Sequence, residues 1–330
     1  MFDLMRKYLS AFSVSGRESE LRDIIMKDLA PYADDMTVDA MGNLIVFKKG
    51  ADSSKKLMTA SHMDEIGFMV VAIEDNGMLR VAPVGSINPL ASCYHTVRFA
   101  SGVCGVLVIE DGTKLADVTN GRLFVDIGAS SAAKAKRRVS VGDLCAVAPL
   151  VRKLGGSRIA AKAHDDRVCC AINAYAAMHC GKPKYDTYFV FTVQEEVGCR
   201  GAKPSSFAVM PDYSIALDVT PAPAVGNPNH LTVTLGGGAA IKIKDSSVIC
   251  SSAVVDRLTE LAKENDIPYQ YEVLLAGGTD TSQMQIAGAG SAVCCISLPT
   301  RYVHTPVETV DAGDMKACAD LLTAFIKQGM

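Results

Sequence analysis

The sequence predicts an α/β protein with a central mixed, mostly parallel sheet flanked by helices and a small all-β domain inserted into it. Outside the segment 68–161, apolar runs typical of buried strands alternate with segments of helical spacing, which indicates parallel strands covered on both faces. Inside that segment, short β-like runs separated by turn residues dominate. We therefore expect one α/β domain from residues 1–67 and 162–330, and an inserted β-barrel-like domain from residues 68–161.

The elements before the insertion are a helix, a hairpin and a strand. The Ser-Gly-Arg-Glu sequence at 15–18 matches a capping box, and apolar residues follow it at helical spacing until Pro31. Two β-like runs joined through Gly42-Asn43 predict a hairpin. The apolar run 56–60 then predicts a buried strand whose carboxyl end delivers His62.

The insertion and the segment after it differ in their predicted secondary structure. Turn sequences such as Asp111-Gly112 separate the β-like runs of the insertion, which are 68–73, 79–82, 96–99, 103–108, 123–125 and 144–147. After the insertion, helices and strands alternate again. The predicted helices are 167–179, 254–263 and 315–327, and the predicted strands are 188–193, 213–219 and 292–298.

Composition excludes several classes of function. The 33 basic and 36 acidic residues are mixed along the chain, so no basic block points to nucleic acid. No run approaches the roughly 18 apolar residues of a membrane span, and the charged N-terminus does not match a signal peptide. The 11 cysteines are odd in number and include no Cys-x-x-Cys pair, so we expect a reducing, cytoplasmic setting and no cysteine-ligated zinc.

Five short motifs of acids and histidines carry the chemistry, and four of them follow a strand-like run directly. The motifs are His62-Met63-Asp64-Glu65, Asp165-Asp166-Arg167, Gln194-Glu195-Glu196, Leu217-Asp218-Val219 and Tyr302-Val303-His304. In open α/β sheets ligands bind outside the carboxyl ends of the strands, so these side chains are expected to meet there. Imidazole and carboxylate ligands suit zinc, with cobalt or manganese as alternatives, and the set predicts a two-metal hydrolytic site.

A two-metal site needs a bridging carboxylate and a base that the ions do not consume. Glu195 and Glu196 can divide the roles of base and ligand, because neighbouring side chains on an extended backbone point to opposite sides. Asp64 lies two residues after His62 and is placed to orient its imidazole. Each motif also has a plain structural reading: a His-x-Asp surface pair, acids in a solvated turn, or a helix cap at Asp165.

Taken together, the motifs resemble those of peptidase family M42, the metal-dependent aminopeptidases that include glutamyl aminopeptidases and the tetrahedral TET aminopeptidases. The resemblance covers essentially the whole chain. Besides the histidine and acid motifs extended to Gly67 and Gly198, it rests on segments 15–18, 39–43, 125–128, 277–280 and 299–304.

The resemblance implies a zinc-peptidase-like fold and an aminopeptidase that removes the N-terminal residue of short peptides. It implies two divalent metal ions per subunit, with Glu195 as general base and Asp64 steering an imidazole. The implied ligands are His62 and Asp218 at one ion, Glu196 and His304 at the other, and Asp165 between them. The inserted domain would be a dimerisation domain, with dimers assembling to a dodecamer.

Several positions depart from the family pattern. Cys169 stands where glycine is usual, His164 where an apolar residue is usual, and Thr281 where alanine is usual. The turn at 85–89 replaces a Gly-Gly-Trp-Asp type turn, and the chain has no tryptophan. The implied ligands are all present, so the departures concern substrate preference and subunit contacts.

Alternatives from other classes stay open at this point. A related two-metal amidase or deacetylase would act on a non-peptide substrate, and a non-catalytic assembly protein could share the fold. Some relatives carry an endoglucanase label, but glycosidases use two carboxylates and no metal. Lys203, Lys242 and Arg301 are candidate partners for an acidic substrate side chain.

Overall fold

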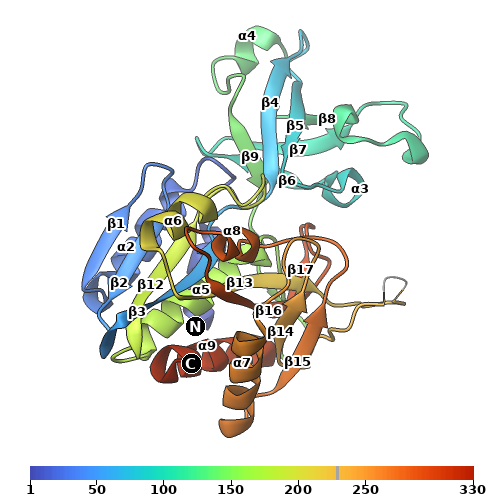
Figure 1. Cartoon of the computed structure of the whole chain (residues 1–330). Helices are drawn as coiled ribbons and strands as arrows, with labels where there is room; N and C mark the ends of the chain where they lie inside the picture. Colours follow the sequence, from blue (N-terminus) through green and yellow to red (C-terminus); the bar gives the residue numbers. More distant parts are fainter. Residues whose placement is uncertain (228–229) are drawn as a thin grey trace.

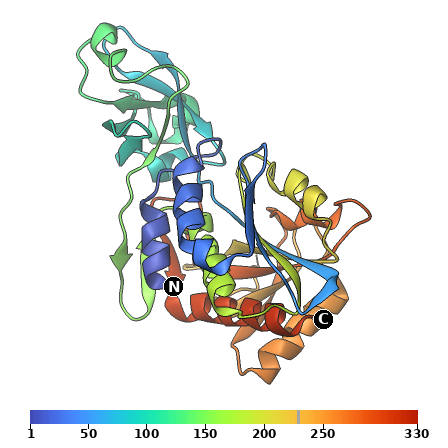
Figure 2. The ribbon, with the colours of Figure 1, turned by 90° about the vertical axis from the view of Figure 1, so that its left-hand side faces the viewer.

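Two β structures organise the chain in the computed structural model, which describes residues 1–227 and 230–330. One is a sheet of eleven strands and the other a closed barrel of six. Figure 1 shows the barrel above the sheet, and Figure 2 shows that it projects from one end of the α/β body. The expected combination of a mixed sheet and an inserted all-β module is confirmed.

The centre of the sheet consists of four parallel strands in the order β12, β3, β13 and β16. Their bounds are Tyr185–Thr192, Asp52–His62, Tyr213–Pro221 and Ala292–Arg301. The strands on either side run antiparallel, so the expectation of a mostly parallel sheet holds for the centre only. These outer strands are β1 (Asp35–Val38), β2 (Leu44–Lys48), β17 (Glu308–Asp311), β11 (Arg158–Ala161) and β10 (Arg152–Lys153).

A branch of the sheet is formed by β14 (Ala239–Lys244), which pairs antiparallel with β16 and parallel with β15 (Tyr269–Val273). Helices cover both faces of the sheet. On one face α5 (His164–His179) packs on the parallel strands, with α1 (Phe2–Ser10), α2 (Ser19–Leu29), η1 (Ala30–Tyr32), α7 (Ser252–Glu264) and α9 (Ala312–Gln328) around it. On the other face α6 (Ala202–Val209) and α8 (Thr281–Gln285) lie side by side (Figure 1).

The helix α5 is the centre of the main core. Nearly all of its side chains are buried, and many are small, including Cys169, Cys170 and Ala171. Small side chains let the helix approach β3 and β13 closely. Asp165 lies at the start of α5, where its own backbone and that of Asp166 depart from helical geometry, so its carboxylate stands where the helix joins the preceding segment.

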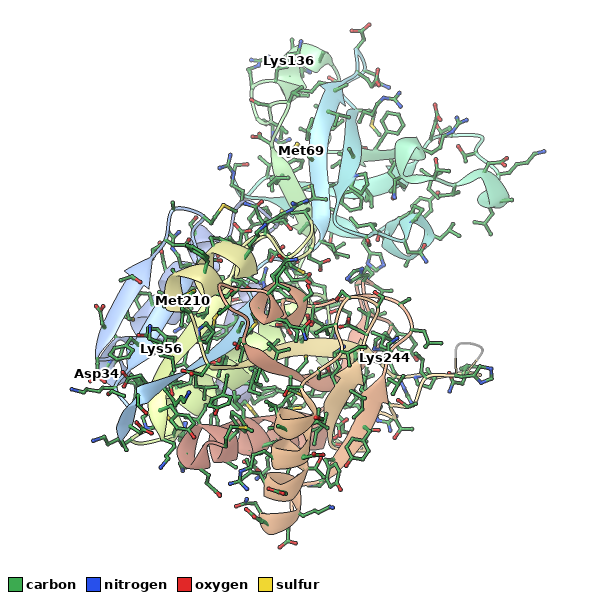
Figure 3. All side chains as sticks on the ribbon, viewed as in Figure 1. Asp34, Lys56, Met69, Lys136, Met210 and Lys244 are labelled. Atoms are coloured by element: carbon green, nitrogen blue, oxygen red, sulfur yellow. The ribbon has the colours of Figure 1, made fainter. Side chains whose placement is uncertain are left out.

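The barrel has the strand order β4, β5, β8, β7, β6 and β9, and every neighbouring pair is antiparallel. The strands are Gly67–Ile73, Leu79–Val84, Leu123–Asp126, Cys104–Ile109, Thr96–Phe99 and Leu144–Val147. Short helical turns connect them: α3 (Pro89–Ser92), η2 (Leu115–Asp117), η3 (Asn120–Arg122) and α4 (Ala132–Ala135). Alternate residues such as Val70, Leu79 and Val125 fill the interior, whereas Met69 (Figure 3) is 37% exposed on the outside.

The structure corrects one prediction near the N-terminus. The capping box expected at 15–18 does not form, because α2 starts at Ser19 and has no side-chain cap. Instead, the Ser15 hydroxyl donates to Asp64 Oδ2 at 2.6 Å, and Glu18 Oε1 accepts the amide of Gln194 at 3.2 Å. These polar side chains bind segments that carry the acid motifs rather than a helix end.

Several elements lacked a prediction: α1, α6, α8, β10, β11, β14, β15 and β17. Among the described residues, no helix is long and apolar enough to cross a membrane.

Candidate active site

The parallel strands bring the five motifs to one edge of the sheet, as expected. His62 is the last residue of β3, Glu195 lies just beyond β12, and Asp218 lies near the end of β13. His304 follows β16 by three residues, and Asp165 stands in the first turn of α5. Residues that are far apart in sequence therefore meet at the carboxyl ends of the strands.

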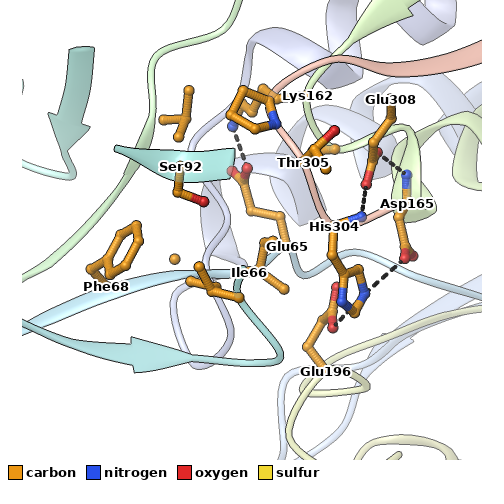
Figure 4. A pocket seen from close by; sticks show the side chains of 15 residues that line it. Glu65, Ile66, Phe68, Ser92, Lys162, Asp165, Glu196, His304, Thr305 and Glu308 are labelled. Atoms are coloured by element: carbon orange, nitrogen blue, oxygen red, sulfur yellow. Dashed lines mark hydrogen bonds and ion pairs between the residues drawn. The ribbon is translucent and has the colours of Figure 1, made fainter. Parts of the chain in front are cut away.

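Asp165 lies between two imidazoles. Its Oδ1 is 3.0 Å from His62 Nε2, and its Oδ2 is 3.2 Å from His304 Nε2. Burial would raise the pKa of Asp165, but the hydrogen bonds and charges of both histidines lower it below its usual range. The carboxylate is therefore ionised, with one oxygen directed at each ring (Figure 4 shows the His304 side).

Two sets of potential ligands share Asp165, and within each set the ligand atoms lie within 4.8 Å of one another. The sets are His62, Asp165, Asp166 and Asp218, and Asp165, Glu196 and His304. Two buried oxygens, Asp166 Oδ1 and Glu196 Oε1, have no hydrogen-bond partner among the described residues. Burial and the charge of Asp165 raise the pKa of Glu196.

Crowded, buried carboxylates with unpartnered oxygens are costly unless a cation neutralises them. The donors are carboxylate oxygens and imidazole nitrogens, which suit zinc, cobalt or manganese. These residues therefore fit two divalent ions that share Asp165.

Asp64 connects the two halves of the site. Its Oδ1 accepts the amide of Glu195 at 3.0 Å, and its Oδ2 accepts the amide of Glu196 at 3.1 Å. His62 Nδ1 lies 3.4 Å from Asp64 Oδ1 and 3.2 Å from the Asp64 carbonyl oxygen. A proton on Nδ1 donated to these oxygens leaves Nε2 free to act as a ligand. Asp64 thus lies beside the imidazole of His62, and it also holds the main chain of the glutamate pair.

Glu195 and Glu196 have different partners, although they stand in a turn rather than on the extended backbone that the sequence suggested. Glu196 Oε2 lies 3.3 Å from His304 Nε2, whereas Glu195 Oε1 accepts the Cys199 thiol at 3.1 Å. Burial raises the pKa of Glu195 to about 7, with the negative charge of Asp280 adding to the effect. A carboxyl group with a pKa near neutrality is suited to exchanging protons at physiological pH.

Glu308 is the main residue that the sequence did not reveal. Its Oε2 accepts the amide of Asp165 at 3.0 Å, and its Oε1 accepts the amide of His304 at 2.8 Å (Figure 4). One buried side chain of β17 therefore holds the backbone of two potential ligands. No sequence pattern indicates such a role, since it depends on main-chain amides from two other elements.

Backbone strain is concentrated around the site. Five non-glycine residues near it have φ between 52° and 61°, in the left-handed region: Ala163, Gln194, Cys199, Tyr302 and His304. This conformation is unfavourable for side chains with a Cβ and persists where surrounding contacts impose it, often at functional sites.

Cavities border the ligand sets on two sides. One is a narrow recess between the sheet and the barrel, and the apolar residues Ile66 and Phe68 line it together with His304 (Figure 4). The other is an open cleft bordered by Asp218 and by segment 276–279. The open cleft therefore leaves room for a substrate beside the shared aspartate.

The proposed partners for an acidic substrate differ in position. Lys242 borders the open cleft, but it is buried and its Nζ lies 2.8 Å from Glu272 and 3.3 Å from Asp245. Its charge is therefore already compensated by two carboxylates. Lys203 belongs to α6, and Arg301 is the last residue of β16.

A second buried network of ion pairs lies next to the site. Glu65 pairs with Lys162 and, at 2.8 Å, with Arg167 (Figure 4 shows the lysine). Arg167 also donates to the carbonyl oxygens of Tyr8 and Ala11, which attaches the N-terminal helix α1 to α5. Neighbouring His164 is fully buried, and burial lowers its pKa to about 4, so its ring is neutral at pH 7.

The fold and the ligand sets define a class of protein: an α/β body with an inserted barrel and a buried cluster of carboxylates and imidazoles that could hold metal ions. A sequence profile described as M42 glutamyl aminopeptidase matches residues 42–321. The chain belongs to this family, as its motifs predicted.

Relatives with names or structures of their own agree with this assignment. A lysyl aminopeptidase of Pyrococcus furiosus is 34% identical over 99% of this chain and 97% of its own length. The structure of an aminopeptidase of the archaeon Desulfurococcus kamchatkensis is 36% identical and has a TM-score of 0.94, covering 99% of this chain and 94% of that one. The TET1 peptidase of Pyrococcus horikoshii, which assembles into a tetrahedron or a large octahedral shell, is 29% identical, with a TM-score of 0.90 and 99% coverage of both chains.

Proposed function

We propose that the protein is a two-metal aminopeptidase of the zinc-peptidase type that removes the N-terminal residue of short peptides. The proposed ligands are His62 and Asp218 at one ion, Glu196 and His304 at the other, and Asp165 between them. The ions, when bound, would polarise the scissile carbonyl and make a water molecule more acidic. The observation that carries the proposal is the Asp165 carboxylate, which presents one oxygen to His62 and the other to His304.

Glu195 is proposed as the general base. Its pKa near 7 lets the carboxylate take a proton from the attacking water and return it to the leaving amine at the same pH. Asp64 acts as a positioning residue, because it holds the amides of Glu195 and Glu196 and faces the outer nitrogen of His62. Glu308 positions Asp165 and His304 in the same way.

The neighbouring glutamates provide a matched test. Glu195→Gln should reduce kcat by about 10²–10⁴-fold, the usual contribution of a general base, while the protein still binds two ions per subunit. Glu196→Gln should instead lower the metal content, measured by atomic emission after dialysis. Full activity of Glu195→Gln would refute the base assignment.

The substrate class needs a separate measurement. A panel of aminoacyl-anilides, acylated amines and oligosaccharides, assayed with and without a chelator, separates an aminopeptidase from an amidase, a glycosidase and a non-catalytic protein. We expect chelator-sensitive release of free N-terminal residues only. Hydrolysis restricted to acylated amines would favour the amidase alternative.

We also propose that the barrel of the predicted domain 68–161 mediates dimerisation and that dimers assemble into a dodecamer. The last strands of that range, β10 and β11, belong to the α/β sheet rather than to the barrel. Support comes from the TET1 relative and from apolar side chains on the outside of the barrel domain. The exposed ones include Met69, Val71, Tyr94, Val106, Leu115 and Val141. Light scattering that gives a monomer would contradict this proposal.

The cytoplasmic location stays a prediction, supported by eleven unpaired cysteines.

A further inference from the structure

A third group of potential ligands lies beside the two sets that share Asp165. It consists of Glu195, Cys199 and Asp280, whose ligand atoms all lie within 4.8 Å of one another. Two of the three stand in the turn between β12 and α6, and Asp280 immediately precedes α8, the helix beside α6 (Figure 1). Glu195 and Cys199 also border the open cleft, so a small ion can reach them from solvent.

The turn after β12 places the thiol on the carboxylate. The amides of Gly198 and Cys199 both donate to the carbonyl oxygen of Glu195 at 2.8 Å, which folds the chain into one tight turn. As a result, Cys199 Sγ lies 3.1 Å from Glu195 Oε1. Tetrahedral zinc, with a sulfur ligand at about 2.3 Å and an oxygen ligand at about 2.1 Å, separates the two by about 3.6 Å. A cation thus fits between them after a shift of about half an ångström.

Asp280 provides an independent indication of a ligand. Its side chain is only 3% exposed, and its Oδ2 accepts the Thr192 hydroxyl at 2.6 Å. Its other oxygen, Oδ1, has no hydrogen-bond partner among the described residues. A buried carboxylate oxygen without a partner is costly, and a cation held with Glu195 and Cys199 would compensate it.

We propose that Glu195, Cys199 and Asp280 form a third metal site, for a thiophilic divalent cation such as Zn²⁺ or Cd²⁺, and that its occupation inhibits the enzyme. Binding replaces the thiol proton by the cation, and the proton leaves to solvent. The inhibitory part rests on the proposed function, because Glu195 coordinated to a third ion can no longer accept a proton from water.

The third site should fill after the first two. It offers three protein ligands, one of which must lose a proton, and two cations bound nearby would repel a further cation. The site would therefore respond to metal in excess of that needed for activity. Its thiolate also distinguishes it chemically, since the other two ligand sets contain only nitrogen and oxygen donors.

Titration of the metal-loaded enzyme with Cd²⁺ tests the binding part. A thiolate-to-cadmium charge-transfer band should appear in the ultraviolet with one further ion per subunit, and it should disappear in Cys199→Ser and weaken in Asp280→Asn. Cys104→Ser is the matched control, because Cys104 is an exposed cysteine of the barrel. A band that persists in Cys199→Ser would overturn the site.

Inhibition by added Zn²⁺ tests the functional part, with each variant compared with its own uninhibited rate. Loss of a group that only supports a metal ligand weakens binding by about 10–100-fold, so loss of the thiolate should raise the inhibition constant by about 100-fold or more. An inhibition constant unchanged in Cys199→Ser would overturn the proposal. A cadmium band without inhibition would overturn the inhibitory role, and retained activity of Glu195→Gln would then trace that failure to the general-base assignment.

Discussion

Asp64→Asn is the sharpest single test of how the site is built. Asp64 touches neither cavity, yet its two oxygens accept the hydroxyl of Ser15 and the amides of Glu195 and Glu196, and one of them faces His62. Burial would raise the pKa of Asp64, but the hydrogen bond and charge of His62, followed by Ser15, lower it. The wild-type side chain is therefore an anion, and asparagine removes its charge at nearly the same shape.

These contacts determine how much stability, metal affinity and kcat the substitution should cost. The asparagine amide has one accepting oxygen, so at least one of the two buried amides loses its acceptor, at a cost of about 1–3 kcal/mol in unfolding free energy. His62 also loses its anionic partner, and losing such a partner lowers metal affinity by about 10–100-fold. With metal saturating, kcat should fall because the base is no longer held, while KM changes little because Asp64 is buried away from substrate.

Three measurements separate these effects: urea unfolding, competition for the metal with a chelator, and kcat and KM at saturating metal. Asp34→Asn is the control, since exposed Asp34 (Figure 3) accepts one amide, that of Lys49, away from the site. Its unfolding free energy should change by no more than about 0.5 kcal/mol. Wild-type metal affinity and kcat in Asp64→Asn would refute the reasoning, whereas a loss of stability alone would reduce Asp64 to a structural residue.

Three further predictions follow from buried charges and the metal. Lys242→Met leaves Glu272 and Asp245 buried without their cation, so urea unfolding should show a loss of about 3–5 kcal/mol, partly recovered by adding Glu272→Gln. Chelation should abolish activity and lower Tm, because an ion at 1,000 times its Kd stabilises the native state by about 4 kcal/mol; an unchanged Tm would contradict bound metal. Burial lowers the pKa of Lys162 to about 8, against about 10.4 in an unfolded chain. Between these two pH values the unfolded chain therefore binds more protons than the folded chain. Stability relative to Lys162→Met should therefore rise from pH 8 to pH 10, and a flat difference would contradict the lowered pKa.

Sequence patterns predicted the parts of the fold whose signal is local. The apolar runs of β3, β12, β13 and β16 and the short runs of the barrel were recognisable because burial on both faces, or alternation, shows in single segments. The helix α1 was missed although Met5, Tyr8 and Leu9 have helical spacing, because nine residues make a short helix whose stability depends on packing. Its main partner is α5, more than 150 residues away, and no local sequence pattern indicates that contact.

The site divides in the same way. Ligand chemistry can be read from residue types at strand ends, and the structure brings those residues together. The support that a ligand receives through main-chain groups cannot be read from the sequence, since it depends on which amides the fold brings to a carboxylate. Glu308 is one example, because it accepts two main-chain amides. Ser15 is another: its position suggested a helix cap, but its hydroxyl donates instead to Asp64, 49 residues away.

The ligand set also spans the point where the barrel enters and leaves the sheet. His62 lies just before the chain enters the barrel, and Asp165 follows β11, a strand of the main sheet that forms after the chain has left the barrel. The buried pair of Glu65 and Lys162 joins these two segments, although the residues are 97 positions apart. Arg167 binds the other oxygen of Glu65, so both segments are tied to the start of α5 as well. Buried charges held on both sides resist displacement, because breaking one contact leaves an uncompensated charge. These contacts therefore link the segment that leads into the barrel to the helix that carries Asp165.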